Sequence, residues 1–258
     1  MALHIDRSGG VATLRIDNPA QRGSLDIETA AAMREACASL AEDRTARVVV
    51  VTGTGNSFCS GADLAAVRGA ASGVLARREL LLRYYGAFLD VRDLPQPTIA
   101  AVGGPAVGAG LNLALACDVR VASVSARFGA TFVRLGIHPG GGATYMLARL
   151  IGPAFAAELA LTGELVGAER AREMGLVNRV VADADLQAAA AELAASMAVG
   201  SPRVTRMTKR ALRVAQDAEF ATVLDLEALA QAASQEADDA AEGWAAFRER
   251  RPPRFEDA

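Results

Sequence analysis

Short apolar runs and helical spacings alternate along the first part of the chain. Val11–Ile16 alternates apolar and polar residues, which predicts a half-exposed strand, and the spacing over residues 26–40 predicts a helix. Residues 47–52 and 97–102 are apolar runs rich in β-branched side chains, so we expect buried strands there. Each run leads into a glycine-rich turn and then a helical pattern. A repeated strand, turn and helix unit indicates a mixed α/β fold.

The pattern changes towards the C-terminus. Residues 118–122 and 126–129 predict short strands, and a Pro/Gly-rich loop over 137–142 opens a helix around 143–151. From residue 185 the chain is mostly alanine-rich helix, with Ser201 before Pro202 as a helix start and one or two helices over 227–244. We therefore predict a core over residues 1–198 and a separate helical region over 199–258.

Composition narrows the classes of protein. With 258 residues, 52% of them hydrophobic, the chain can bury a large core. A formal charge of −3 argues against a nucleic-acid binder, and no apolar run approaches the ~20 residues needed to span a bilayer. Cys37, Cys59 and Cys117 are odd in number and far apart, which favours a reducing cytoplasm and suggests neither disulfides nor a thiolate metal site. Lys209 is the single lysine, so arginines would hold any phosphate-bearing ligand.

Two glycine-rich turns carry the candidate chemistry. They are F-C-S-G-A-D-L at residues 58–64 and G-G-P-A-V-G-A-G-L-N-L-A-L-A-C-D at 103–118, and each follows a predicted strand. A backbone N–H can approach a substrate only where side chains are small, and a helix N-terminus adds a favourable dipole potential. Two such donors would stabilise negative charge on one oxygen.

Both turns resemble the signatures of the crotonase (enoyl-CoA hydratase/isomerase) family, as do residues 161–181 and 242–253. The resemblance implies an α/β spiral of repeated ββα units, a helical C-terminal trimerisation region, and a homotrimer or a hexamer of paired trimers. It also implies an acyl-CoA ligand in fatty acid metabolism, with coenzyme A as part of the substrate and no separate cofactor. The backbone N–H groups of Ala62 and Ala109 would form the oxyanion hole for the thioester oxygen.

The same resemblance implies which residues border coenzyme A. Phe247 and Arg250 match positions that can reach the nucleotide of a neighbouring subunit, although both also fit a solvated helix end. Asp63 would chiefly brace its turn. The full set of implied coenzyme A contacts is Arg22, Ser24, Leu25, Cys59, Ser60, Asp63, Leu64, Phe247 and Arg250.

The acidic positions of the family are empty. Hydratase glutamates fall on Asn112 and Phe132, and the acid of some isomerases and dehalogenases falls on Gly140. Neither an amide nor a phenyl ring transfers protons, so we expect standard hydration to be weak or absent. His138 is the imidazole nearest the predicted pocket and is a candidate base, although a loop histidine bonded to backbone is commoner. Arg134 and Glu164 are further candidates for a role in catalysis, because the resemblance places their segments near the site.

Two functions remain open on the sequence. One is an enzyme of the enoyl-CoA hydratase/isomerase type, and the other is a binding or carrier protein that holds an acyl-CoA without converting it. A purely structural scaffold would bind no coenzyme A. The dinucleotide-binding motif is incomplete, because Phe58 and Leu113 stand where its third glycine is required. Ala109 replaces the lysine of a P-loop, and Ser60 lacks the leading glycine of a nucleophile elbow. The two histidines are far apart in the sequence, which gives a metal site little support.

Overall fold

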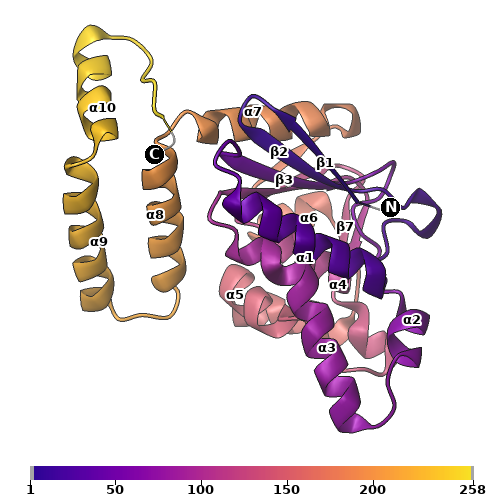
Figure 1. Cartoon of the computed structure of the whole chain (residues 1–258). Coiled ribbons are helices and arrows are strands. Elements are labelled where there is room, and N and C mark those ends of the chain that lie inside the picture. The colour runs from indigo at the N-terminus through magenta and orange to yellow at the C-terminus, as the bar shows by residue number, and fades with distance from the viewer. Residues whose placement is uncertain (1–2, 257–258) are drawn as a thin grey trace.

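The computed structural model describes residues 3–256, except the side chains of Leu64 and Arg68. The strands are β1 (Leu3–Ser8), β2 (Val11–Ile16), β3 (Val48–Gly53), β4 (Thr98–Val102), β5 (Pro105–Val107), β6 (Val119–Ser123), β7 (Arg127–Gly129), β8 (Val166–Gly167) and β9 (Arg179–Val181). The helices are α1 (Ile27–Glu42), α2 (Leu64–Gly69), α3 (Val74–Leu89), α4 (Ala109–Ala116), α5 (Ala143–Thr162), α6 (Ala168–Glu173), α7 (Leu186–Ala198), α8 (Pro202–Val214), α9 (Phe220–Gln235) and α10 (Asp238–Glu249). Strands and helices alternate as far as α7 and only helices follow (Figure 1), which confirms the predicted α/β fold with a helical C-terminal region.

The continuous apolar run of β3 is explained by burial on both faces. β3 lies inside a six-stranded sheet of order β1-β2-β3-β4-β6-β9, in which β1 is antiparallel to β2 and the other neighbours are parallel. Side chains alternate between the faces of a strand. Val48 and Val50 pack with Leu193 of α7, whereas Val49 and Val51 belong to the main core on the other face. Helices on both faces of the sheet therefore demand apolar residues at every position.

A smaller sheet brings the two glycine-rich turns together. β5, β7 and β8 form three strands, and isolated bridges join Leu25 to Ala62 and Cys59 to Ala106. Segments that are distant in sequence are thus laid side by side, and α4 begins two residues after β5. This arrangement places the start of α4 next to the first turn.

Helices α8, α9 and α10 form an arm that extends away from the body (Figure 1). Large apolar side chains on this arm are open to solvent in the single chain: Leu212 is 65% exposed, Phe220 79%, Leu229 68% and Trp244 66%. Apolar surface of this kind is typical of contact regions between proteins. The body ends with α7 at Ala198, while the division into two units stays a prediction.

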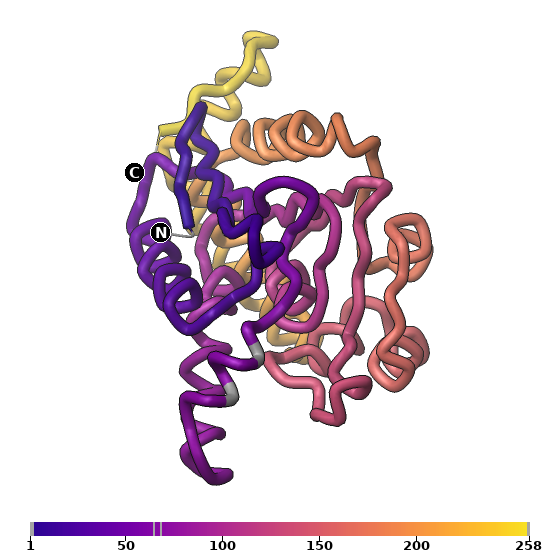
Figure 2. Tube along the Cα trace, turned by 90° about the vertical axis from the view of Figure 1, so that its right-hand side faces the viewer, coloured from indigo at the N-terminus to yellow at the C-terminus, as the bar shows by residue number. Residues whose placement is uncertain are grey.

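Some elements differ from the sequence-based expectation. The prediction of helix over 227–244 was too short, because α9 begins at Phe220 and α10 ends at Glu249. β1 and α3 were not predicted at all, and α3 projects beyond the body in Figures 1 and 2. None of the helices within the described residues combines the length and the apolar character needed to cross a membrane.

Gly110 allows α4 to pack directly on the first turn, which gives a stability prediction. A β-carbon at position 110 would overlap the Cys59 carbonyl oxygen and lie 2.7 Å from its carbon. We expect Gly110→Ala to lower the free energy of unfolding by about 1–3 kcal/mol, since backbone must shift to relieve the overlap. Gly69→Ala is the matched helical control, because nothing lies within 4 Å of its β-carbon. The prediction would be contradicted if urea unfolding gave both variants the same free energy of unfolding as the wild type.

Candidate functional site

The first glycine-rich turn leaves the amide of Ala62 unpaired. The Leu25 N–H donates to the Gly61 carbonyl at 2.8 Å, and the Asp63 N–H donates to the Leu25 carbonyl at 2.9 Å. In a parallel bridge, the residue between two such bonds points its own N–H to the opposite side. No backbone carbonyl of the described residues accepts a hydrogen bond from Ala62. Its N–H is therefore available to a ligand.

The second turn presents the amide of Ala109 beside the first. Ala109 is the first residue of α4 and follows Gly108, whose φ of +55° favours glycine. The first amides of a helix have no acceptor within it, and no backbone carbonyl in the described part of the chain pairs with Ala109. A β-carbon built on Gly61 would lie 3.9 Å from the Ala109 nitrogen and 2.9 Å from the Val107 oxygen. Two unpaired amides thus occupy neighbouring turns, separated by a residue without a side chain.

The segment implied to bind coenzyme A lies against the first turn. Arg22 has a positive φ of 53°. Its carbonyl accepts a hydrogen bond from the Ser60 N–H at 3.0 Å. Ser24 donates through its hydroxyl to Gln21 at 3.2 Å, and the Ser60 hydroxyl donates to the Gln21 carbonyl at 3.1 Å. Leu25 is fully buried. The fold therefore brings Arg22, Ser24, Leu25 and Ser60 together.

Three further residues of the first turn have structural surroundings. Cys59 is fully buried, and burial raises the pKa of its thiol to about 12, so the thiol stays neutral. Asp63 accepts a hydrogen bond from the Ala66 N–H at 3.0 Å and caps α2, as expected of a residue that braces the turn. The side chain of Leu64 lies outside the described part of the structure.

The three empty acid positions converge on the second turn. Asn112 is 1% exposed and donates through Nδ2 to the Gly140 carbonyl at 2.8 Å. The ring tip of Phe132 lies 3.9 Å from where a β-carbon on Gly108 would be. A β-carbon on Gly140 would overlap the hydroxyl of Tyr85. At these positions the structure therefore offers an amide, a phenyl ring and a phenol in place of carboxylates.

Tyr85 is the residue that the sequence analysis missed. It belongs to α3 and is half-buried, and burial raises the pKa of its hydroxyl. Nothing in the local sequence indicates that Tyr85 lies at the candidate site, because only the packing of α3 against the loop at Gly140 brings Tyr85 and Gly140 together. A tyrosine pair at residues 84–85 within a helical spacing is equally typical of a core helix.

The candidate base His138 and the further candidates Arg134 and Glu164 are exposed. His138 is exposed, and its Nδ1 donates to the Pro139 carbonyl at 2.8 Å, since a carbonyl can only accept. Arg134 and Glu164 form an exposed ion pair at 3.7 Å, and Arg134 also donates to the Thr162 carbonyl at 3.0 Å. These three side chains already have partners outside the two turns.

Phe247 and Arg250 lie far from both turns within one chain. They belong to the end of α10 on the arm, whereas the turns lie in the body (Figure 1). Phe247 is 77% exposed and its ring is 6.5 Å from that of Trp244, in a T-shaped arrangement. Arg250 ends α10 with a positive φ of 54°. Any contact of these residues with a ligand at Ala62 would have to come from another subunit.

A hollow of about 560 Å³ runs along one face of α3 and ends at Tyr85. Its apolar wall includes Val74, which is 84% exposed, and Leu82, which is 54% exposed. The lining side chains recur at helical spacing, so they share one stripe of the helix. The lining residues are Gly73, Val74, Arg77, Arg78, Leu81, Leu82 and Tyr85.

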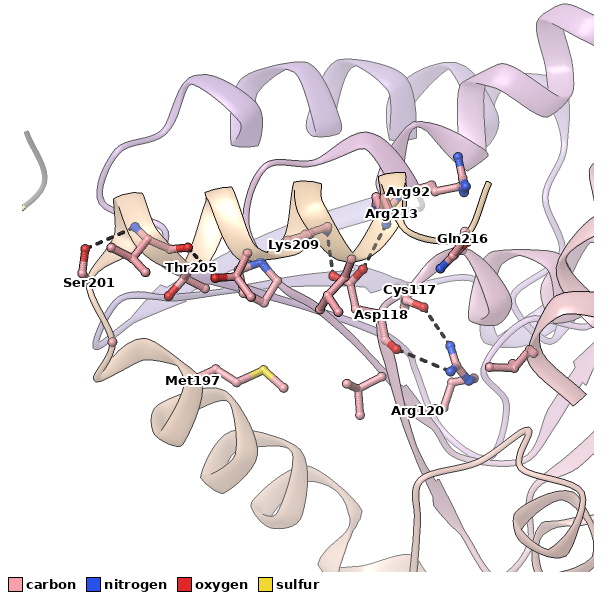
Figure 3. Close-up of a pocket in the computed structure, with 18 of the residues that line it drawn as sticks. Arg92, Cys117, Asp118, Arg120, Met197, Ser201, Thr205, Lys209, Arg213 and Gln216 are labelled. Atoms are coloured by element: carbon pink, nitrogen blue, oxygen red, sulfur yellow. Dashed lines mark hydrogen bonds and ion pairs between the residues drawn. The ribbon is translucent and has the colours of Figure 1, made fainter. Parts of the chain in front are cut away.

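A larger cavity, of about 1060 Å³, lies elsewhere, between α8 and the body (Figure 3). At its wall the Asp118 carboxylate is 2.7 Å from Lys209 Nζ and 3.0 Å from Arg213 Nη2. The cavity is remote from the unpaired amides, so we place the candidate site at the two turns and the hollow along α3. Residues 3–256 hold no group of three or more His, Cys, Asp or Glu side chains able to bind a metal.

Comparisons with known proteins identify the family of the chain. The sequence profile described as Enoyl-CoA hydratase/isomerase matches residues 6–258. The chain is 46% identical over 203 residues to the Mycobacterium tuberculosis protein named "Probable enoyl-CoA hydratase EchA14", covering 79% of this chain and 78% of that protein. It is 38% identical to human enoyl-CoA hydratase domain-containing protein 2, mitochondrial, covering 95% of this chain and 85% of that protein.

A solved structure matches over the whole length. The crystal structure of enoyl-CoA hydratase from Bacillus anthracis superimposes with a TM-score of 0.95 at 34% sequence identity and covers 100% of both chains. The crotonase-like fold implied by the two turns is therefore confirmed. On its sequence and its fold, the chain belongs to the enoyl-CoA hydratase/isomerase family.

Proposed function

We propose that this protein binds an acyl-CoA thioester with its carbonyl oxygen between the amides of Ala62 and Ala109. The observation that carries the proposal is that both N–H groups lack backbone acceptors and lie on neighbouring turns. A thioester enolate concentrates negative charge on that oxygen, and each aligned donor is worth about 3 kcal/mol of barrier. Ala109 is buried and Ala62 is half-buried, and a low local dielectric strengthens such hydrogen bonds.

Coenzyme A would lie along Arg22, Ser24, Leu25 and Ser60, with the acyl chain towards the hollow beside α3. Backbone atoms dominate this strip, since the carbonyl of Arg22 is held by Ser60 and the guanidinium of Arg22 is left exposed for phosphate. Cys59, Asp63 and Leu64 would border the ligand through their backbone.

The assembly is part of the same proposal. The apolar surface of the arm supports a homotrimer or a hexamer in which residues 199–258 form the contacts. A cytoplasmic location is proposed because the three cysteines favour a reducing compartment. Phe247 and Arg250 would then reach the nucleotide of a neighbouring subunit. Size-exclusion chromatography with light scattering tests the assembly independently of ligand binding.

Standard hydration is expected to be weak because no carboxylate occupies positions 112, 132 or 140. A general acid or base contributes about 10²–10⁴-fold to a rate. We therefore expect the double variant Asn112→Glu, Phe132→Glu to hydrate crotonyl-CoA at least about 100-fold faster than the wild type. The matched control is Asn112→Gln, Phe132→Gln, which cannot transfer protons and should show no gain. Wild-type turnover already equal to the glutamate variant would contradict this reading.

The second candidate function is a non-catalytic acyl-CoA carrier. It is favoured by the replacement of all three acids with uncharged residues. Calorimetry with several acyl-CoAs, combined with mass spectrometry of the products, separates the two functions. Tight binding without product supports the carrier, and any product supports the enzyme. If His138 is the base, the His138→Ala variant should form none of the product that the wild type forms.

A further inference from the structure

Arg120 is a buried cation at the C-terminal end of α4. It belongs to β6 and is 3% exposed. Its Nη1 donates to the Cys117 carbonyl at 2.7 Å (Figure 3). The same nitrogen donates to the Ala114 carbonyl at 3.3 Å, and Nε donates to the Leu176 carbonyl at 2.7 Å. Ala114 lies in the last turn of α4 and Cys117 is its C-cap, so the guanidinium fills the place where the final carbonyls of a helix lack donors.

The charge of Arg120 has no carboxylate partner among the described residues. Its side chain donates only to backbone carbonyls. Burial lowers the pKa of the guanidinium, which nevertheless stays charged at neutral pH. The field of the Asp118 carboxylate reaches Arg120, but that carboxylate has two cations of its own, Lys209 Nζ at 2.7 Å and Arg213 Nη2 at 3.0 Å. This end of α4 therefore carries an excess of positive charge.

Helix α4 joins this charge to the proposed oxyanion hole. The helix has 8 residues, which makes it about 12 Å long, and Ala109 is its first residue. An α-helix carries about half a positive charge at its N-terminus and about half a negative charge at its C-terminus. The negative end opposes an oxyanion at Ala109, whereas a full positive charge placed at that end more than cancels the opposition. The position of Arg120 thus favours negative charge at the opposite end of the helix.

We propose that Arg120 is a positioning residue that strengthens the oxyanion hole from the far end of α4 without touching the ligand. This inference rests on the proposed acyl-CoA function. The guanidinium holds the last carbonyls of the helix that presents the Ala109 N–H, and its charge favours the enolate of a bound thioester over the neutral form. The attraction persists over the length of α4 because the helix is buried, and charges interact more strongly in a low dielectric.

The enolate pKa of bound acetoacetyl-CoA, followed by ultraviolet absorption, tests this role. The variant Arg120→Gln keeps a donor for a carbonyl of α4 but removes the charge. We expect it to raise the pKa of the bound ligand by about 0.5–1 unit, which matches two unit charges about 15 Å apart at an effective dielectric constant of about 20. Arg120→Lys keeps the charge and loses the planar fork, so its rise should be much smaller.

A variant on α8 keeps the test independent of a folding defect at position 120. Arg213 adds positive charge at the same end of α4, but its one hydrogen bond goes to the Asp118 carboxylate, and its Nε and Nη1 have no partner. Arg213→Gln should raise the enolate pKa in the same direction. The rise should be smaller than for Arg120→Gln, because Asp93 lies 3.8 Å from Arg213 Nη1 and offsets part of its charge. Arg210→Gln, exposed on the same helix, is the matched control and should keep the wild-type value.

The outcomes separate the role of Arg120 from the proposed function. A folded Arg120→Gln variant with the wild-type enolate pKa overturns that role and leaves the oxyanion hole standing. Equal rises in Arg120→Gln and Arg120→Lys also overturn it, because they mark a displaced helix and not a lost charge. If circular dichroism shows both to be unfolded, a wild-type pKa in Arg213→Gln overturns it. Wild-type protein that leaves the pKa of acetoacetyl-CoA at its free value overturns the oxyanion hole, and this inference with it.

Discussion

An Ala109→Pro variant is expected to lose most of its ability to stabilise the enolate of bound acetoacetyl-CoA. Proline has no N–H, so it removes one of the two proposed donors, while its fixed φ suits the first position of α4. Loss of one donor costs about 3 kcal/mol, which corresponds to about two pKa units of the bound ligand. The ultraviolet absorption of the enolate during a pH titration measures that pKa, which should lie about two units higher in the variant.

The matched control places proline at the first position of another helix. Asp238 begins α10, and the preceding Ala237 has φ −90° and ψ 154°, which a following proline accepts. Asp238→Pro should leave the pKa of bound acetoacetyl-CoA at its wild-type value. The assignment of the oxyanion hole would be wrong if the Ala109→Pro variant bound acetoacetyl-CoA and the bound ligand titrated with its wild-type pKa. Calorimetry with coenzyme A alone shows whether the rest of the ligand site survives.

The elements nearest the two turns were predictable because local chemistry determines them. The alternation of Val11–Ile16 corresponds to β2, and the apolar run over 47–52 corresponds to β3 within one residue. Glycine was required at Gly61, Gly108 and Gly110, where a positive φ or a close approach of backbone excludes a side chain. The need for small residues in the two turns therefore followed from the sequence, whereas the assignment of the two amides to Ala62 and Ala109 came from the family resemblance and stays a prediction.

The surroundings of the amides could not be predicted in the same way. Tyr85 reaches Gly140 only because α3 packs beside α4, and this contact joins residues that are distant in sequence. No spacing rule links them. The bounds of α9 were missed for a related reason, since Phe220 and Leu224 are exposed in the single chain and show no core-facing stripe. Apolar residues that face a partner carry no periodicity towards their own core.

Lys209 has a structural role that the sequence concealed. The presence of a single lysine indicated only that arginines would hold a phosphate-bearing ligand, and it gave no role to Lys209, which is 8% exposed. Its Nζ lies 2.7 Å from an Asp118 carboxylate oxygen and donates to the Gln96 carbonyl at 2.7 Å. Asp118 also accepts from Arg213 at 3.0 Å (Figure 3). It accepts a further hydrogen bond from the Thr98 N–H at 2.8 Å. This network fastens α8, and with it the arm, to the body.

Lys209→Met is expected to destabilise the protein by about 3 kcal/mol at neutral pH. Methionine keeps the length of the side chain but leaves the Asp118 carboxylate half-buried with only Arg213 as a charged partner. Removing one member of a buried ion pair typically costs about 3–5 kcal/mol, and the remaining guanidinium places this case at the lower end. Arg210→Met is the matched control, since Arg210 is exposed on the same helix, and it should change the free energy of unfolding by less than about 0.5 kcal/mol.

The pH dependence of this loss identifies the ion pair as its cause. Burial alone would raise the pKa of Asp118, but Lys209 and the hydrogen bonds outweigh it and lower that pKa. A carboxyl group with a lowered folded-state pKa contributes stability above its unfolded pKa of about 4 and loses it as the pH falls further. The difference in unfolding free energy between wild type and Lys209→Met should therefore be constant from pH 7 to about 5 and shrink below about 4. Urea unfolding across that range measures it, and a difference independent of pH would mean that lost packing, not lost charge, destabilises the variant.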